Sequence, residues 1–153
     1  MKIYSFIASI AGIGFIKKGG GTVAANVFCL VWYLLPASYV SSYWQVINAL
    51  LICGIGTWCA NKVDKIWGKD SSKVVVDEVA GMAITLLYVP QNIYFLLAGL
   101  ILFRLFDIFK PLGIKELEKL PGGWGVMADD VLAGIYSLMV LQLFIYFYRI
   151  HIT

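Results

Sequence analysis

Five carboxylates stand at the ends of apolar segments, in a pattern that could serve chemistry at a membrane surface. Two of them, Asp129 and Asp130, are adjacent and directly precede an uncharged run over 131–148. Carboxylates beside a membrane helix cost free energy unless another group binds them. Mg²⁺ takes oxygen ligands and is commonly shared between one or two carboxylates and a substrate phosphate. The pattern predicts a Mg²⁺ site formed from among Asp77, Glu78, Asp107, Asp129 and Asp130.

Two basic residues near the third of these acids could bind phosphate. Arg104 and Lys110 flank Asp107 at positions i−3 and i+3. A guanidinium and an ammonium at these positions would hold phosphate oxygens through charge-assisted hydrogen bonds. The metal, the phosphate ligands and the membrane surface together indicate a lipid phosphate as the substrate.

A glycine-rich segment, KKGGGTVAAN over 17–26, precedes the first long apolar stretch. Backbone N–H groups at the start of a helix form a natural anion site. We expect Gly21 and Thr22 to bind phosphate there, with Thr22 as the N-terminal cap of the helix. Asn26 would lie one turn further along the same face and add a polar contact.

Each of these features also has a purely structural interpretation. Asp129 at a helix start could be only an N-terminal cap, and Asp77 with Glu78 could complement the helix dipole. Arg104 and Asp107 could form a structural ion pair within one helix. The glycine-rich segment lacks Walker spacing and follows no strand. The coincidence of all these features at one membrane face favours the functional interpretation.

The composition is that of an integral membrane protein. Of the 153 residues, 61% are hydrophobic and 14% charged, whereas a soluble domain is nearer half apolar and a quarter charged. Strand alternation is absent, and in lipid the backbone must satisfy its own hydrogen bonds. We therefore predict a single all-α domain over 1–153, a polytopic bundle with about four to five membrane-embedded helices. The predicted apolar segments cover 22–36, 43–60, 74–89, 93–109 and 129–150.

Charge in the connecting loops predicts the topology. The loops 17–21, 61–73 and 110–127 carry lysines, whereas 36–42 and 90–92 carry no charge. The positive-inside rule places the three basic loops in the cytoplasm. Five crossings satisfy this arrangement and leave the C-terminus outside, although the short third segment could be re-entrant. The five carboxylates then meet at the cytoplasmic face, and residues 1–18 are expected to form an interfacial segment rather than a signal peptide.

Several other chemistries lack their residues. The three cysteines lie in apolar runs and form neither a C-x5-R motif nor a zinc pattern, and the single histidine, His151, is remote from the acids. The D-x-D-x-T motif and the CDP-alcohol transferase pattern are missing as well. The net charge of +3 gathers on no basic soluble face, which argues against nucleic acid binding. A metal-activated water or a carboxylate nucleophile remains.

These motifs together resemble those of the phosphatidylglycerophosphatase A family. The family usually shows G-x-G, then prolines, then P-G-T-x-G-S near its N-terminus. This sequence keeps Gly12, Gly14, Gly21 and Thr22 but has Lys17 and Gly20 where prolines are usual. Ala24 and Ala25 replace the Gly-Ser, and Gly113 stands where proline is frequent. Three blocks carry the match: DSSKVVVDEVAGM over 70–82, FRLFDIFKPLGI over 103–114 and GGWGVMADDVLAG over 122–134.

The resemblance implies a Mg²⁺-dependent phosphatase of the bacterial inner membrane, with its active site facing the cytoplasm. It would hydrolyse phosphatidylglycerophosphate, a phospholipid in the membrane, to phosphatidylglycerol and inorganic phosphate, the last step in making that lipid. The family's conserved acids map onto the five carboxylates, and its other polar positions onto Arg104, Lys110 and Thr22. Some of Glu78, Asp129 and Asp130 would hold Mg²⁺. Asp77 or Asp107 would deprotonate water or attack phosphorus directly.

Three other classes of protein compete with this interpretation. A phosphatase for phosphatidic acid or an isoprenyl pyrophosphate would share the same site, and headgroup competition would distinguish it. A small membrane transporter is disfavoured because the chain has no internal repeat and no acid in mid-helix. A non-catalytic scaffold predicts that the carboxylates can be neutralised without biochemical loss. Trp and Tyr at the bundle edges would permit a homo-oligomer.

Overall fold

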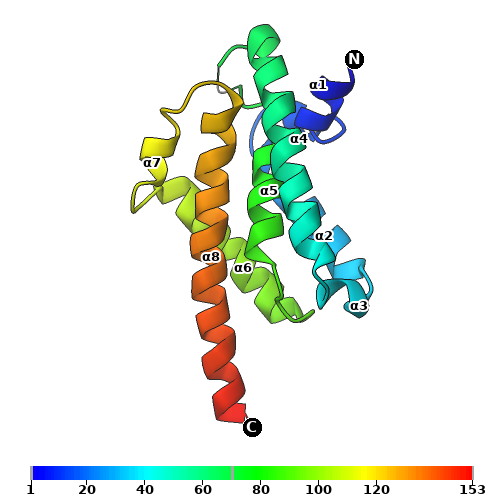
Figure 1. Ribbon diagram of the computed structural model, residues 1–153, viewed down its shortest axis with the longest axis vertical. Helices are drawn as coiled ribbons and strands as arrows, with labels where there is room; N and C mark the ends of the chain where they lie inside the picture. Colours follow the sequence, from blue (N-terminus) through cyan, green and yellow to red (C-terminus); the bar gives the residue numbers. More distant parts are fainter. Residues whose placement is uncertain (1, 70, 153) are drawn as a thin grey trace.

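The computed structural model describes residues 2–69 and 71–152, and this part of the chain is all-helical, as predicted (Figure 1). Three residues lie outside the described part: Met1, Thr153 and Asp70, which is the first residue of the block DSSKVVVDEVAGM. In chain order the elements are α1 Ile3–Ala8, the 3₁₀ helix η1 Ile13–Phe15, α2 Gly20–Leu34, α3 Ala37–Val40, α4 Trp44–Trp67, α5 Val76–Thr85, α6 Ile93–Phe109, α7 Ile114–Leu117 and α8 Gly123–Ile152.

The short helix α5 is the centre of the bundle. It packs against α8, α4, α2 and α6, while α8 runs from beside α5 to the C-terminus at the far end of the molecule (Figure 1). Glycines bring α5 and α8 together: a Cβ on Gly134 would stand 2.5 Å from the carbonyl oxygen of Gly81. A Cβ on Gly81 would in turn stand 2.8 Å from the carbonyl oxygen of Asp130. This backbone contact fixes the acidic ends of the two helices side by side.

Apolar residues fill the contact between α5, α6 and α8. Met82, Leu86, Phe103 and Leu141 are fully buried there. Among the described residues, two helices, α4 and α8, are long and apolar enough to cross a bilayer. Their outer faces carry large exposed apolar side chains, which is the arrangement that a lipid environment favours.

The helix boundaries differ from the predicted ones most at α8. Helix α6 matches its predicted segment, but α8 begins at Gly123 rather than at residue 129. The side chain of Asn61 explains the early start, since its Oδ1 accepts a hydrogen bond from the Gly123 N–H at 2.8 Å. The interpretation of Asp129 as an N-terminal cap is therefore wrong. Asp129 and Asp130 lie inside the helix.

The start of α2 also differs from the prediction. Gly19 occupies the N-cap position with a left-handed φ of 79°, so the expectation that Thr22 caps the helix is wrong. Thr22 lies in the first turn, and its carbonyl oxygen accepts a hydrogen bond from the Asn26 side chain at 2.7 Å. The α4 helix extends to Trp67, beyond the predicted end at 60, and α5 covers only part of 74–89.

Candidate active site

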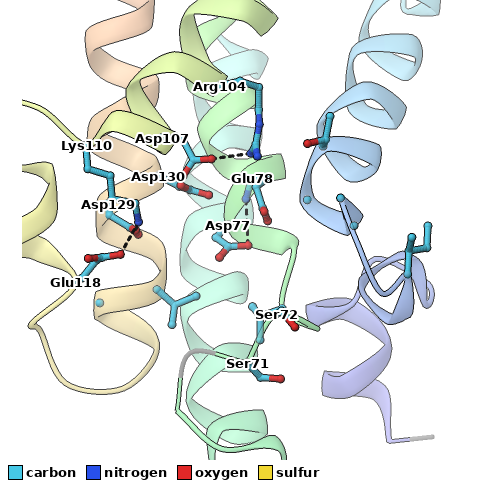
Figure 2. Close-up of a pocket in the computed structure, with 18 of the residues that line it drawn as sticks. Ser71, Ser72, Asp77, Glu78, Arg104, Asp107, Lys110, Glu118, Asp129 and Asp130 are labelled. Atoms are coloured by element: carbon cyan, nitrogen blue, oxygen red, sulfur yellow. Dashed lines mark hydrogen bonds and ion pairs between the residues drawn. The ribbon is translucent and has the colours of Figure 1, made fainter.

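A polar cavity of about 350 Å³ opens at one end of the bundle, beside the contact between α5 and α8 (Figure 2). Helices α2, α5, α6 and α8 and the loops next to them form its walls. Its charged and hydroxyl-bearing lining residues are Lys17, Thr22, Ser71, Ser72, Asp77, Glu78, Arg104, Asp107, Lys110, Glu118, Asp129 and Asp130.

Three of these carboxylates form a group that could hold a cation. Asp77 and Glu78 from α5 and Asp130 from α8 each offer an oxygen, and these oxygens lie within 4.8 Å of one another. Asp130 is only 4% exposed, and Glu78 Oε2 is buried without a hydrogen-bond partner. Carboxylates this close repel one another, and a divalent cation would relieve the repulsion. The donor set suits Mg²⁺, which prefers oxygen ligands.

The α2 N-terminus lies directly against this carboxylate group. A Cβ built on Gly21 would fall 1.6 Å from Glu78 Oε1. Glycine is therefore required at this position for Glu78 to keep its place. The contact brings the first turn of α2, including Thr22, to the edge of the cavity.

Asp129 has a different partner from its neighbour Asp130. Lys110, just after α6, donates hydrogen bonds to Asp129 Oδ2 and to Glu118 Oε1, each at 2.5 Å (Figure 2). Partial burial alone would lower the pKa of the Lys110 ammonium. The two carboxylates outweigh burial and raise that pKa above its ordinary value, so Lys110 is charged throughout the neutral range.

Arg104 provides a second cation on the same side of the cavity. Its Nη1 lies 2.6 Å from Asp107 Oδ2, which is the i,i+3 ion pair that the sequence permits. Figure 2 shows Asp107 between Arg104 and Asp130. The cavity thus holds a carboxylate group able to bind a cation, flanked by a guanidinium and an ammonium able to bind phosphate.

Most of the predicted site residues meet in this cavity. All five carboxylates line it, together with Gly21, Thr22, Arg104 and Lys110. Asn26 is exposed and does not line it. Sequence reasoning did not single out Glu118 as a site residue. Its pairing with Lys110 spans eight positions and the α7 turn, so no helical spacing signals it.

Comparisons with known proteins agree with this chemistry. The family model described as phosphatidylglycerophosphatase A matches residues 6–145. The chain is 39% identical over 153 residues to a Bacteroides thetaiotaomicron protein named "Putative phosphatidylinositol-3-phosphatase", covering 92% of this chain and 95% of that one. It is 34% identical over 126 residues to phosphatidylglycerophosphatase A of Escherichia coli K12, covering 79% and 69%.

A third similar protein is phosphatidylglycerophosphatase A of Haemophilus influenzae. The identity is 33% over 133 residues, which cover 85% of this chain and 81% of that protein. No solved structure matches the chain.

Proposed function

This chain belongs to the phosphatidylglycerophosphatase A family, and we propose that the cavity beside α5 and α8 is its active site. The enzyme is a phosphatase that hydrolyses phosphatidylglycerophosphate to phosphatidylglycerol and inorganic phosphate. The observation that carries the location is the group Asp77, Glu78 and Asp130, whose oxygens converge within 4.8 Å beside two cations.

We propose that these three carboxylates bind Mg²⁺. The fit rests on the convergence of oxygen donors from two helices and on the unpartnered buried oxygen of Glu78. Bound there, Mg²⁺ would polarise the phosphoryl group and lower the pKa of a water molecule. Phosphate binding and proton transfer fall to residues of this chain.

Arg104, Lys110 and the first turn of α2 would bind the oxygens of the terminal phosphate. Negative charge is held on these oxygens as the phosphorus–oxygen bond to glycerol breaks, and fixed donors around them lower the barrier. Lys110 and Arg104 are already oriented by their carboxylate partners. Fixed donors of this kind need little reorganisation when the substrate reacts.

We propose Asp107 as the group that accepts the proton from the attacking water. Asp77 belongs to the carboxylate group that would hold the cation, which leaves Asp107 as the other predicted base. Asp107 faces the same group from α6 and keeps one oxygen outside its ion pair with Arg104. Asp129 would then act as the residue that orients Lys110.

The placement in the membrane is also a proposal. Helices α4 and α8 would cross the bilayer, with the remaining apolar helices embedded to give four to five membrane-embedded helices. Residues of all three basic loops, 17–21, 61–73 and 110–127, line the cavity. By the positive-inside rule, this supports an active site that faces the cytoplasm of a bacterial inner membrane. The diacyl chains would stay in the inner leaflet.

A phosphatidylinositol phosphate is the second candidate substrate. The Bacteroides thetaiotaomicron relative carries a name for that activity and matches nearly the whole of this chain. The proposed Mg²⁺ and the side chains that would bind phosphate oxygens suit the phosphomonoester of either lipid, phosphatidylglycerophosphate or a phosphatidylinositol phosphate. Competition between the two lipids in one assay would show which headgroup the cavity prefers.

The first experiment is phosphate release from phosphatidylglycerophosphate in detergent micelles, with Mg²⁺ and with EDTA. We expect release that needs Mg²⁺ and disappears in Asp130→Asn. Glu116→Gln is the matched control, because Glu116 is an exposed acid that does not line the cavity. Turnover by Asp130→Asn equal to that of Glu116→Gln would contradict the assignment of the site. Full release in EDTA would contradict the proposal that the enzyme needs Mg²⁺.

A further inference from the structure

The cavity has a second polar region at its rim, away from the carboxylate group. It consists of Lys17, Ser71 and Ser72, which we call the rim cluster. Figure 2 shows Ser71 and Ser72 on the segment that leads into α5, with their hydroxyls directed toward the side of the α1–α2 connection, and Lys17 lies on that connection. Among the described lining residues, the acids come from α5, α6, α8 and the end of α7 instead.

Backbone contacts hold the two segments of the rim cluster together. A Cβ on Gly14 would stand 2.0 Å from the carbonyl oxygen of Lys73, so the two segments are in backbone contact there. The Val75 N–H donates to the carbonyl oxygen of Ala8 at 2.9 Å, which ties the second segment to α1 as well. The position of the rim cluster is therefore set by the fold on both sides.

The rim cluster keeps its polar groups uncommitted. Arg104 and Lys110 are each paired with carboxylates, whereas Lys17 forms no ion pair with any described residue. The hydroxyls of Ser71 and Ser72 likewise make no hydrogen bond within the described part of the chain. One ammonium and two hydroxyls at one place suit an anion with several oxygens.

The residues beside Lys17 have the character of a segment at a membrane interface. Phe15 is 48% exposed and Ile16 is 45% exposed, directly before two lysines in the chain. Exposed apolar side chains next to lysine are typical of the membrane interface, where the ammonium reaches the headgroup layer. Lipid phosphodiesters lie in that layer.

We propose that Lys17, Ser71 and Ser72 bind the phosphodiester that joins the substrate's headgroup to its diacylglycerol. This inference rests on the proposed function, in which the terminal phosphate occupies the carboxylate end of the cavity. The glycerol between the two phosphates would span the distance from that end to the rim. The enzyme would then prefer lipids that carry both a phosphomonoester and a phosphodiester over phosphatidic acid, whose single phosphate fills only one of the two positions.

The test compares Lys17→Ala with Lys18→Ala in the full-length protein. Both changes remove one charge, but Lys18 does not line the cavity. We expect Lys17→Ala to raise the KM for phosphatidylglycerophosphate about tenfold while kcat stays within about twofold, since a hydrogen bond to a charged group is lost. Lys17→Arg should restore most of the affinity, and Ser71→Ala with Ser72→Ala should raise the KM by a smaller factor.

Inhibition by orthophosphate separates the two ends of the cavity. Orthophosphate resembles only the terminal group, so its inhibition constant should be the same for the wild type and for Lys17→Ala. An equal increase in that constant would mean that Lys17 serves the terminal phosphate and would overturn the assignment. Equal effects of Lys17→Ala and Lys18→Ala, or no effect of either, would overturn it as well. Failure of the wild type to release phosphate from the lipid would instead contradict the proposed function.

Discussion

The two halves of α8 invert the usual relation between burial and polarity. Over 123–134 the helix buries two aspartates and packs Gly134 against α5, whereas over 135–152 it exposes Met139, Leu143 and Phe144. In a soluble protein the charges would be outside and the large apolar side chains inside. The first half is therefore shaped by its partners within the protein, whereas the second half has the exposed apolar surface that a lipid environment favours.

Neutralising a buried carboxylate in the first half of α8 should have the largest effect. We expect Asp130→Asn to lower phosphate release by more than about a hundredfold, because Asp130 is a proposed Mg²⁺ ligand and the loss of a residue that only orients a ligand already costs roughly 10- to 100-fold. Thermal unfolding in detergent should show that Mg²⁺ stabilises the wild type but not this variant. Without Mg²⁺ the variant should unfold no earlier than the wild type, because one of three repelling carboxylates has gone. A Mg²⁺ stabilisation that persists in Asp130→Asn would contradict the site.

Lys110, which pairs with Asp129 in the first half of α8, should give the next largest effect. We expect Lys110→Met to lower kcat/KM by roughly 10- to 100-fold, since a hydrogen bond to a charged group contributes roughly 1.5–3 kcal/mol. The comparison is Lys115→Met, because Lys115 is exposed on the same connection and does not line the cavity. Similar losses in both variants would point to general surface charge and not to the pairing with Asp129.

The glycine contact tests how closely the buried half depends on α5. Gly134→Ala places a Cβ 2.5 Å from a backbone oxygen of Gly81, so the helices must move apart. We expect a loss of about 2 kcal/mol in the free energy of unfolding, in the range found for overpacked cores. Activity should fall several-fold, because Asp130 moves relative to Asp77. Unchanged stability and activity would show that the two helices tolerate wider spacing.

Truncation of an exposed apolar side chain in the second half of α8 should have the smallest effect. Met139 is 64% exposed on the outer face of α8. Met139→Ala should leave phosphate release within about twofold and the unfolding temperature nearly unchanged, as surface substitutions usually do. A large loss of activity would show that this face contacts protein, as it would in a homo-oligomer, and size measurement in detergent would then follow.

The long apolar helices and the meeting of the acids could be predicted from sequence. Long apolar runs predict helices directly, and the predicted bounds of α6, 93–109, are the observed ones. The five carboxylates also meet as the motif pattern indicated. These features depend on residues close together in the chain or on motifs of fixed spacing.

The start of α8 and the division of roles at its acids could not be predicted in this way. Asn61 caps the helix from a position far away in the sequence. Consecutive residues on a helix point about 100° apart. Asp130 therefore turns toward α5 and its carboxylates, while Asp129 turns toward Lys110. Which neighbour lies in each direction depends on the packing of three helices.

The hydrogen bonds of Lys110 have a consequence for the entropy of substrate binding. An ammonium carries three N–H donors, and Asp129 and Glu118 accept two of them. A single donor is left for a phosphate oxygen, and its direction is already fixed. The rotational freedom of this long side chain was lost when the protein folded, so an arriving lipid does not have to restrict it.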